Sequence, residues 1–270
     1  MKNNHPFDLK LFTGIIIVAF LFLLVLVSFI YMPYNPNEIS ISEKLSSFSA
    51  SHILGTDNLG RDIFSRILVS LRVSFFIGFV SATCGLITGS LLGSAGGYFG
   101  GIADAFVTKL IDVQMAFPGV LLALMLAAVL GPGTGTTLLA LCIMTIPRFA
   151  RISRSGFLRY RHSSLVLAQK ARGASVFRIV FIHIFPNICN ELLVTYSLSF
   201  ATSIMSESGL SYLGLGIQPP DASFGKMLSD AQGYIFQFPQ GIFVPAFTLA
   251  LLIIGFTLIG DGLTTYIERD

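Results

Sequence analysis

The chain contains 270 residues, of which 53% are hydrophobic and 11% are charged, and its formal net charge is +3. Soluble domains carry about 25% charged residues, and a soluble fold of this size has no way to hide so much apolar surface from water. The composition therefore excludes a water-soluble globular protein. It predicts an all-α integral membrane protein with one membrane domain.

The first predicted membrane span runs from Leu11 to Tyr31 and is long enough to cross a bilayer as a helix. Basic residues precede it, as they do in a signal peptide. However, its apolar core is too long for a signal peptide, and Tyr31-Met32-Pro33 offers no cleavage site with small residues. We therefore expect this span to be a retained anchor.

A charged segment separates the first span from the second. Arg61, Arg66 and Arg72 alternate with Asp57 and Asp62, and the apolar residues between them fall on one helical face. Those apolar residues are Ile63, Phe64, Ile67, Leu68 and Leu71. The pattern predicts a helix that lies in the outer membrane interface before span two.

The second span is predicted from about Val73 to Ala95, because residues 73–103 contain no charged residue. Its glycines recur at helical spacing, at positions 78, 85, 89, 93, 96 and 97. Small residues allow helix backbones to approach closely in lipid, so we expect this helix to pack in the interior of the bundle.

Residues 113–147 also lack charge and contain spans three and four, with a tight turn at residues 131–135, Gly-Pro-Gly-Thr-Gly. Span five is predicted from about Ile188 to Met205, and span six from about Phe243 to Ile259. The central parts of all six predicted spans therefore lack charge.

The acidic residues near the span ends, the cysteines and the histidines are interpreted as structural residues. Asp112, Glu191 and Glu207 lie near predicted span ends, where we expect them to anchor helix ends at the membrane interface. The three cysteines lie in apolar context and are expected to be buried. No two of the four histidines have the spacing of metal ligands, so no metal site is predicted.

The charge distribution predicts the orientation. Residues 148–178 contain eight basic residues and no acidic residue. The positive-inside rule places this segment in the cytoplasm. With six spans, both termini then lie in the cytoplasm as well.

Residues 160–187 are too apolar for a solvated linker. We predict two short helices, Ser164–Arg172 and Val176–Phe185, which are separated at Gly173-Ala174-Ser175 and ended by Pro186. A helix-turn-helix with small residues at its elbow can seat in a groove of a partner protein. A basic loop held on anionic lipid is the alternative, and the loop by itself does not decide between them.

Four blocks of sequence resemble a known family. The run LVLAQKARGASVFRIVFIHIFPN contains Gly173, His183 and Pro186, and it is similar to the cytoplasmic signature loop of ABC importer permeases. Segment His52–Ser74 resembles the entry signature of the dipeptide, oligopeptide and nickel subfamily, and Gly209–Leu228 is similar to the outer loop of the same subfamily. Ile259-Gly260-Asp261-Gly262-Leu263 is similar to its usual C-terminal end. The resemblance is to the second-permease type of this subfamily.

The resemblance implies the fold of a type I ABC importer permease, with six transmembrane helices and a cytoplasmic helix-turn-helix coupling loop. The single domain, residues 1–270, would then consist of an anchor helix with an external interfacial segment, 1–72, and a five-helix module, 73–270. The coupling loop would be 160–187. Its implied contact residues are Ala168, Ala171, Gly173, Ala174, Ser175, His183 and Pro186.

The resemblance also implies the partners and the place of the protein. These are a homologous second permease, two ATP-binding subunits, an extracellular or periplasmic substrate-binding protein and membrane lipid, without nucleic acid. ATP and Mg²⁺ would be used by the partner ATPases, so this chain would bind no cofactor and have no catalytic residue. The expected location is the bacterial cytoplasmic membrane.

The substrate expected from the resemblance is nickel, free or chelated, with di- or oligopeptides as the alternative. DIFSR near position 64 and SDAQGYIFQFPQ from Ser229 to Gln240 resemble the nickel permeases more than the oligopeptide permeases. A stand-alone secondary transporter or channel is a second functional class, but such proteins usually place charges near the bilayer midplane. An intramembrane protease needs an embedded Ser-His or Asp pair, and the sequence shows none.

Overall fold

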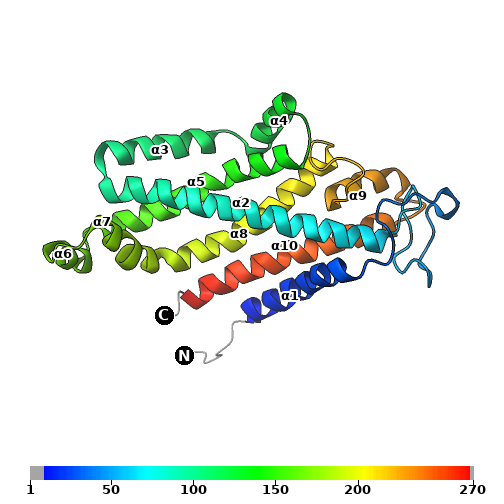
Figure 1. Cartoon of the computed structure of the whole chain (residues 1–270), viewed down its shortest axis with the longest axis horizontal. Coiled ribbons are helices and arrows are strands. Elements are labelled where there is room, and N and C mark those ends of the chain that lie inside the picture. The colour runs from blue at the N-terminus through cyan, green and yellow to red at the C-terminus, as the bar shows by residue number, and fades with distance from the viewer. Residues whose placement is uncertain (1–8, 268–270) are drawn as a thin grey trace.

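The computed structural model describes residues 9–267, and this part of the chain is a bundle of helices without strands. Five long helices lie roughly along one common direction (Figure 1). They are α1 (Leu9–Ile30), α2 (Ile63–Phe99), α5 (Thr134–Tyr160), α8 (Phe185–Tyr212) and α10 (Gln240–Ile267). Each is long and apolar enough to cross a membrane.

A sixth span is broken. Helices α3 (Gly101–Ala116) and α4 (Gly119–Leu130) meet at an angle of 82°. The break falls at Phe117-Pro118, and both residues have extended backbone conformations. Proline disfavours a helical conformation in the residue before it, and it has no N–H to donate to the preceding turn. The two helices count as one span if the bent pair is taken together, which gives the six spans expected from the sequence.

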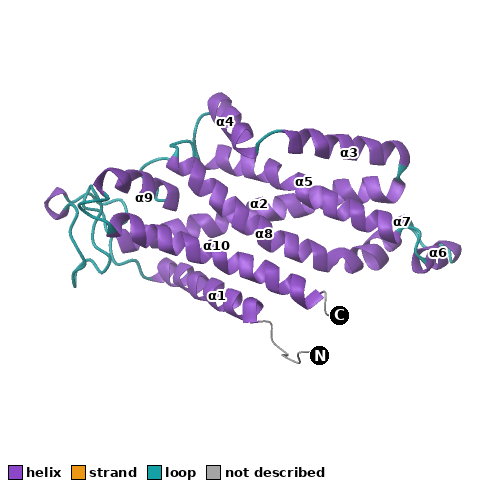
Figure 2. Ribbon diagram, turned by 180° about the vertical axis from the view of Figure 1, so that it is seen from behind, coloured by secondary structure: helices purple, strands orange, loops and turns teal. Residues whose placement is uncertain are grey.

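Short elements lie at the two ends of the bundle (Figure 2). At one end are η1 (Ile41–Glu43), α9 (Phe224–Ala231) and η3 (Gln232–Tyr234), together with most of the loops. At the other end are α6 (Ser164–Ala171), α7 (Val176–Arg178) and the π-helical segment η2 (Ile179–Ile184). Helix α1 begins and α10 ends at this second end.

Helices α2 and α5 form the most extensive contact in the bundle. Gly85, Gly89, Gly93 and Gly97 recur every fourth residue, so they form one stripe along α2. A Cβ atom at Gly89 would lie 2.6 Å from the Ile146 carbonyl oxygen, and one at Gly97 would lie 2.7 Å from that of Arg154. The stripe confirms that the glycines of span two mediate close helix packing.

Hydroxyl groups cross the same contact. Thr145 Oγ1 donates to the Ser81 carbonyl at 2.9 Å, and Ser153 Oγ donates to the Ser90 carbonyl at 3.0 Å. Both donors are on α5 and both acceptors are on α2. In a dry helix interface such hydrogen bonds add to the packing that the small residues permit.

Helix α2 differs from the expectation at its start. The segment predicted as a separate interfacial helix is the first part of α2, and Ile63, Ile67, Leu68 and Leu71 are all buried. Arg66 in this turn is only 1% exposed, which an interfacial helix would not allow. The apolar face found in the sequence therefore packs against protein rather than lipid.

Two further boundaries differ from the expectation. Helix α5 continues to Tyr160, so the basic residues 148, 151, 154 and 159 lie on a helix and not in a loop. Pro186 does not end a helix, because α7 and η2 lead directly into α8 and Pro186 stands at its first turn. Pro186 therefore lies within a continuous helical stretch, directly after the π-helical segment η2, rather than at the end of a helix.

Replacing Gly89 with alanine is expected to destabilise the chain by about 1–3 kcal/mol, because the added methyl group would force α2 and α5 apart. Thermal unfolding of the purified protein in detergent would measure this. Gly209 on α8 is the matched control, since a Cβ there would meet no atom within 4 Å. Gly209→Ala should leave the midpoint unchanged or raise it slightly, and equal midpoints for the two variants would contradict the packing argument.

Candidate functional site

Residues 160–187, here called the end hairpin, project from the end of the bundle at which α1 begins and α10 ends (Figure 1). The hairpin consists of α6, a turn at Gly173-Ala174-Ser175, and the continuous stretch of α7 and η2. The predicted helix-turn-helix is therefore present, with its elbow at the predicted residues.

Gly173 makes the elbow possible. Its φ is +76°, a left-handed conformation that glycine adopts without a steric cost. The Gly173 N–H donates to the Lys170 carbonyl, and the Ala174 N–H donates to the Gln169 carbonyl, both at 3.0 Å. This is the Schellman pattern that ends a helix. No atom lies within 4 Å of the place where a Cβ would stand, so the surface above Gly173 is open.

Serine side chains begin both helices of the hairpin. Ser163 Oγ accepts from the Val166 N–H, and Ser175 Oγ accepts from the Arg178 N–H, each at 3.4 Å. Such N-caps satisfy backbone donors that a helix start leaves free. Ser175, one of the predicted contact residues, therefore shapes the elbow.

The inner side of the hairpin packs on the bundle. Val166, Ile179 and Ile184 are buried in one cluster with Phe157 of α5 and Ile188 of α8. The hairpin is thus seated on the ends of two long helices and is not a loose loop. A displacement of the hairpin would be transmitted to both helices through this contact.

The outer side of the hairpin exposes apolar and basic residues together. Phe177 is 70% exposed, Ile182 58% and Leu167 51%, and Lys170 and Arg172 are also exposed. A monomeric soluble surface rarely exposes so many large apolar groups in one place, so this side has the character of a protein or membrane contact.

The seven predicted contact residues are all in this hairpin or at its base. Ala168, Ala171, Gly173, Ser175 and Pro186 are exposed, whereas Ala174 and His183 are partly buried. His183 lies in η2, and its carbonyl accepts from Asn187 Nδ2 at 2.6 Å. The residues are therefore together in one hairpin.

Sequence reasoning missed Arg148. It was assigned to a cytoplasmic loop, but it lies near the middle of α5, roughly 20 Å from either end at 1.5 Å per residue. The expectation that all six spans lack central charge is therefore wrong. Residues 113–147 lack charge and Arg148 follows them directly, but α5 continues through both Pro147 and Arg148.

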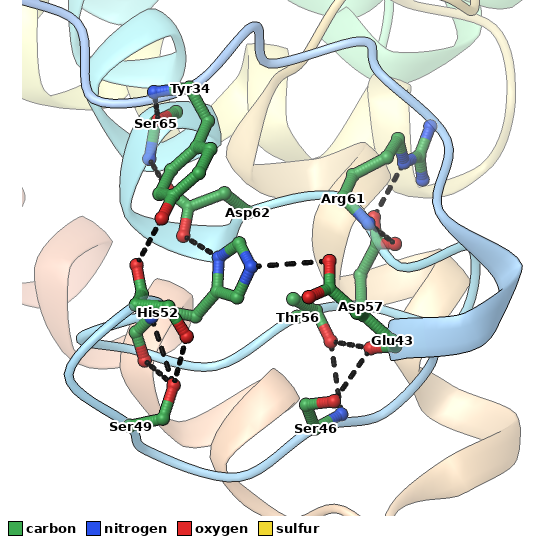
Figure 3. A network of polar contacts seen from close by, with 11 residues as sticks. Tyr34, Glu43, Ser46, Ser49, His52, Thr56, Asp57, Arg61, Asp62 and Ser65 are labelled. Carbon is green, nitrogen blue, oxygen red and sulfur yellow. Dashed lines mark hydrogen bonds and ion pairs between the residues drawn. The ribbon is translucent and has the colours of Figure 1, made fainter.

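The opposite end of the bundle is held by polar contacts (Figure 3). Asp62 caps α2, since its Oδ2 accepts from the Ser65 N–H at 2.8 Å, and its Oδ1 lies 2.9 Å from His52 Nδ1. His52 Nε2 lies 3.5 Å from Glu43, and His52 stacks on Tyr34. This network fixes residues 31–62, here called the outer segment, against the start of α2.

The arginines of this end are also partnered. Arg61 lies 2.6 Å from Asp57 and 3.3 Å from Asp230 of α9, and Arg66 Nη1 donates to the Pro36 carbonyl at 3.1 Å. Arg72 Nε donates to Ser28 Oγ at 2.6 Å. These partners explain why basic residues occur at the end that the positive-inside rule expects to be poor in them.

The three acidic residues assigned to span ends differ in their surroundings. Glu191 lies 2.7 Å from Arg159, and Asp112 lies 3.8 Å from Arg151, so both form exposed ion pairs. Glu207 is completely buried instead, and Ser211 Oγ donates to it at 2.7 Å. Within residues 9–267 no group of three or more metal-ligating side chains is found.

Comparison with known proteins gives one family. Residues 85–270 match the model of the family described as "Binding-protein-dependent transport system inner membrane component".

The similar curated proteins are transport permeases. The dipeptide transport system permease protein DppC of Alkalihalophilus pseudofirmus is 39% identical, covering 94% of this chain and 82% of that protein. The glutathione transport system permease protein GsiD of Pectobacterium atrosepticum is 36% identical, covering 92% and 84%. The oligopeptide transport system permease protein OppC of Bacillus subtilis is 36% identical, covering 93% and 82%.

Solved structures share the fold at lower identity. A chain of the inward-facing MetNI methionine ABC transporter matches with a TM-score of 0.58 and 18% identity, covering 75% of this chain and 94% of that chain. A chain of an amino acid ABC transporter matches with a TM-score of 0.57 and 15% identity, covering 76% and 94%.

At the end of the bundle opposite the end hairpin, replacing Asp62 with alanine is expected to loosen the outer segment. The variant loses the cap of α2 and leaves buried His52 without its nearest partner, which together cost about 1–3 kcal/mol. Limited proteolysis within residues 31–62 should be faster than in the wild-type protein. Asp62→Asn keeps a capping oxygen and should fall between the two. Unchanged proteolysis of Asp62→Ala would contradict the role of the network.

Proposed function

Because this chain belongs to the family of binding-protein-dependent inner membrane components, the permease subunits of ATP-driven importers, we propose that it carries short peptides across the membrane. The observation that carries the proposal is the set of relatives named for dipeptides, oligopeptides and glutathione, which align with more than nine-tenths of this chain. The expectation of nickel finds no support among these relatives, and we set it aside in favour of peptides.

The end hairpin is the proposed contact with the ATPase. Its elbow at Gly173 is open to the outside, and its outer side exposes apolar and basic groups. Its base is packed on α5 and α8. A subunit bound to the outer side would therefore push on two long helices at once. ATP and Mg²⁺ belong to that subunit in this proposal, and this chain contributes only the contact residues.

The remaining partners follow from the same proposal. A homologous permease would cover the uncovered faces of α3, α4 and α5, because several large apolar residues there are exposed, among them Phe106, Val113 and Met125. A substrate-binding protein would dock at the outer segment and α9. Residues 73–270 would form the permease module and residues 1–72 an anchor with an outer cap, and α2, which begins at Ile63, would join the two parts. Rigid tilting of the two permeases would then open the path to each side in turn.

The proposed orientation places the end hairpin in the cytoplasm. Apart from Arg148, the basic residues of α5 and those of the hairpin lie toward this end, in agreement with the positive-inside rule. Residues 1–8 and 268–270, on which the expectation for the termini falls, lie outside the described part of the chain. The start of α1 and the end of α10 are adjacent, since a Cβ at Gly262 would lie 2.6 Å from the Leu11 nitrogen.

Reconstitution tests the function and the coupling contact together. The importer, assembled with its ATPases, second permease and binding protein, should take up a labelled dipeptide when ATP is supplied, and should not take up nickel. Gly173→Glu should abolish this uptake and reduce ATPase co-purification at least tenfold, because it buries an unpaired charge in the contact at a cost of several kcal/mol. Nickel uptake without peptide uptake would overturn the substrate proposal.

Gly101→Glu is the matched control for Gly173→Glu. Gly101 also has a positive φ of +56° and no atom near its Cβ position, and it is the first residue of α3, at the same end of the bundle. The two variants therefore share the backbone strain and the added charge. Normal transport in Gly173→Glu, or equal loss in Gly101→Glu, would show that the elbow has no special role in coupling.

Cysteine labelling tests the orientation. In a variant without Cys84, Cys142 and Cys189, a cysteine at position 159 should react only with reagent on the cytoplasmic side. A cysteine at position 237 should react only with reagent on the outer side. Both positions are exposed and lie near opposite ends of the bundle. Reaction of both from one side would refute the six-span arrangement.

A further inference from the structure

Arg148 is a charged residue at mid-span on an uncovered face. It is exposed, whereas Pro147, Phe149 and Ala150 beside it on α5 are buried. A charge at this depth is costly if it faces lipid, and such residues almost always face a protein interior or a water-filled cavity. The position of Arg148 therefore marks the side of α5 that faces the interior of the assembled transporter.

Two grooves meet at this side chain. One has a volume of about 870 Å³, lies between α5, α8 and α10, and is lined by Arg148, Leu198, Thr202, Ile253 and other residues. The other has a volume of about 340 Å³ and lies between α5 and the break of the α3–α4 span. Apart from Arg148, the larger groove contains one further charged residue, Glu191, which is already paired with Arg159.

The break of the third span is further evidence that this side of α5 faces the substrate path. Phe117 and Gly119, on either side of the break, line the smaller groove together with Arg148. In membrane transporters, helices broken at mid-span line the substrate path, because their freed backbone groups are tolerated only beside a cavity. The charged side chain and the broken helix thus point to the same place.

The guanidinium group of Arg148 has capacity to bind a ligand. Nη1 donates to Thr202 Oγ1 at 3.2 Å and to Ser199 Oγ at 3.5 Å. Among residues 9–267, no carboxylate lies within ion-pair distance, and Nε and Nη2 have no hydrogen-bond partner. The other arginines in the inner half of α5, Arg151, Arg154 and Arg159, are each paired with an acidic residue.

We infer that Arg148 is a substrate-specificity residue that binds the C-terminal carboxylate of the peptide inside the groove. This inference rests on the proposed function and names a contact within it. The planar fork of a guanidinium matches a carboxylate with two parallel hydrogen bonds, and every unmodified linear peptide carries that group whatever its side chains. The apolar walls accept side chains without selecting among them, so the site recognises peptides as a class.

The test compares a dipeptide with its C-terminal amide in the assembled importer. Arg148→Gln should lower uptake of the free acid about tenfold, the effect of one lost charge-assisted pair, and leave uptake of the amide nearly unchanged. Arg148→Lys keeps the charge but loses the planar fork, so it should recover only part of the uptake of the free acid. Arg151→Gln, one turn away and outside both grooves, should change neither substrate.

If the binding protein does not deliver the amide, the uptake comparison is not possible, and a second measurement tests the contact without delivery by the binding protein. Thr202→Cys, in a variant without the three native cysteines, places a thiol beside Arg148. Free-acid dipeptide added from the cytoplasmic side should slow labelling of this thiol in the assembled importer. The protection should disappear when Arg148→Gln is added. Protection that persists without Arg148 would overturn the inference.

The remaining outcomes distinguish carboxylate binding by Arg148 from its other possible roles. Equal losses for the acid and the amide would show that Arg148 has a structural role, and loss of the second permease from the purified complex would show that it pairs with a carboxylate of that subunit. Unchanged uptake in Arg148→Gln would show no role. Absence of peptide uptake in the wild-type importer would instead refute the proposed function, before any variant is compared.

Discussion

The close contact between α2 and α5 is the constraint on which the rest of the structure depends. The glycine stripe of α2 brings the two backbones so near that a methyl group at Gly89 would clash with the Ile146 carbonyl. Because lipid is as apolar as a leucine side chain, burial of apolar surface gives helices little reason to associate in a membrane. Close packing and the hydrogen bonds from Thr145 and Ser153 must supply that reason here.

This contact also determines which way α5 faces. Thr145, Phe149 and Ser153 are buried against α2 and its neighbours, and residues on the opposite side of the helix remain uncovered. Arg148 belongs to the uncovered side, and α5 continues without interruption to the end hairpin. One rigid helix of about 18 Å therefore joins the proposed carboxylate site to the proposed ATPase contact. A tilt of α5 driven from the hairpin would move Arg148 with it.

Much of this arrangement could be predicted from the sequence, because the signals were local. The spacing of Gly85, Gly89, Gly93 and Gly97 predicted close packing, and the small residues Gly-Ala-Ser at 173–175 predicted the bend of the hairpin. The helix boundaries could not be predicted in this way. From the distribution of charges, Ile63–Leu71 was expected at the membrane interface and Arg148 in a loop. Both expectations are wrong because the distribution of charges along a sequence does not show whether a side chain faces lipid or a neighbouring helix. Burial of Arg66 and the orientation of Arg148 are consequences of tertiary packing.

The charge in the middle of α5 also changes the reason for rejecting a secondary transporter. The absence of central charge cannot be that reason, since Arg148 lies at mid-span. The chemistry of the group gives a better one. Ion-coupled transport of protons needs side chains that gain and lose a proton, such as aspartate, glutamate or histidine. Arginine keeps its charge in proteins, so it cannot relay protons, but it can bind an anion throughout the transport cycle. A permanent cation in a groove with apolar walls is therefore suited to binding an anion, and under the proposed function the energy for transport comes from the ATPase subunits.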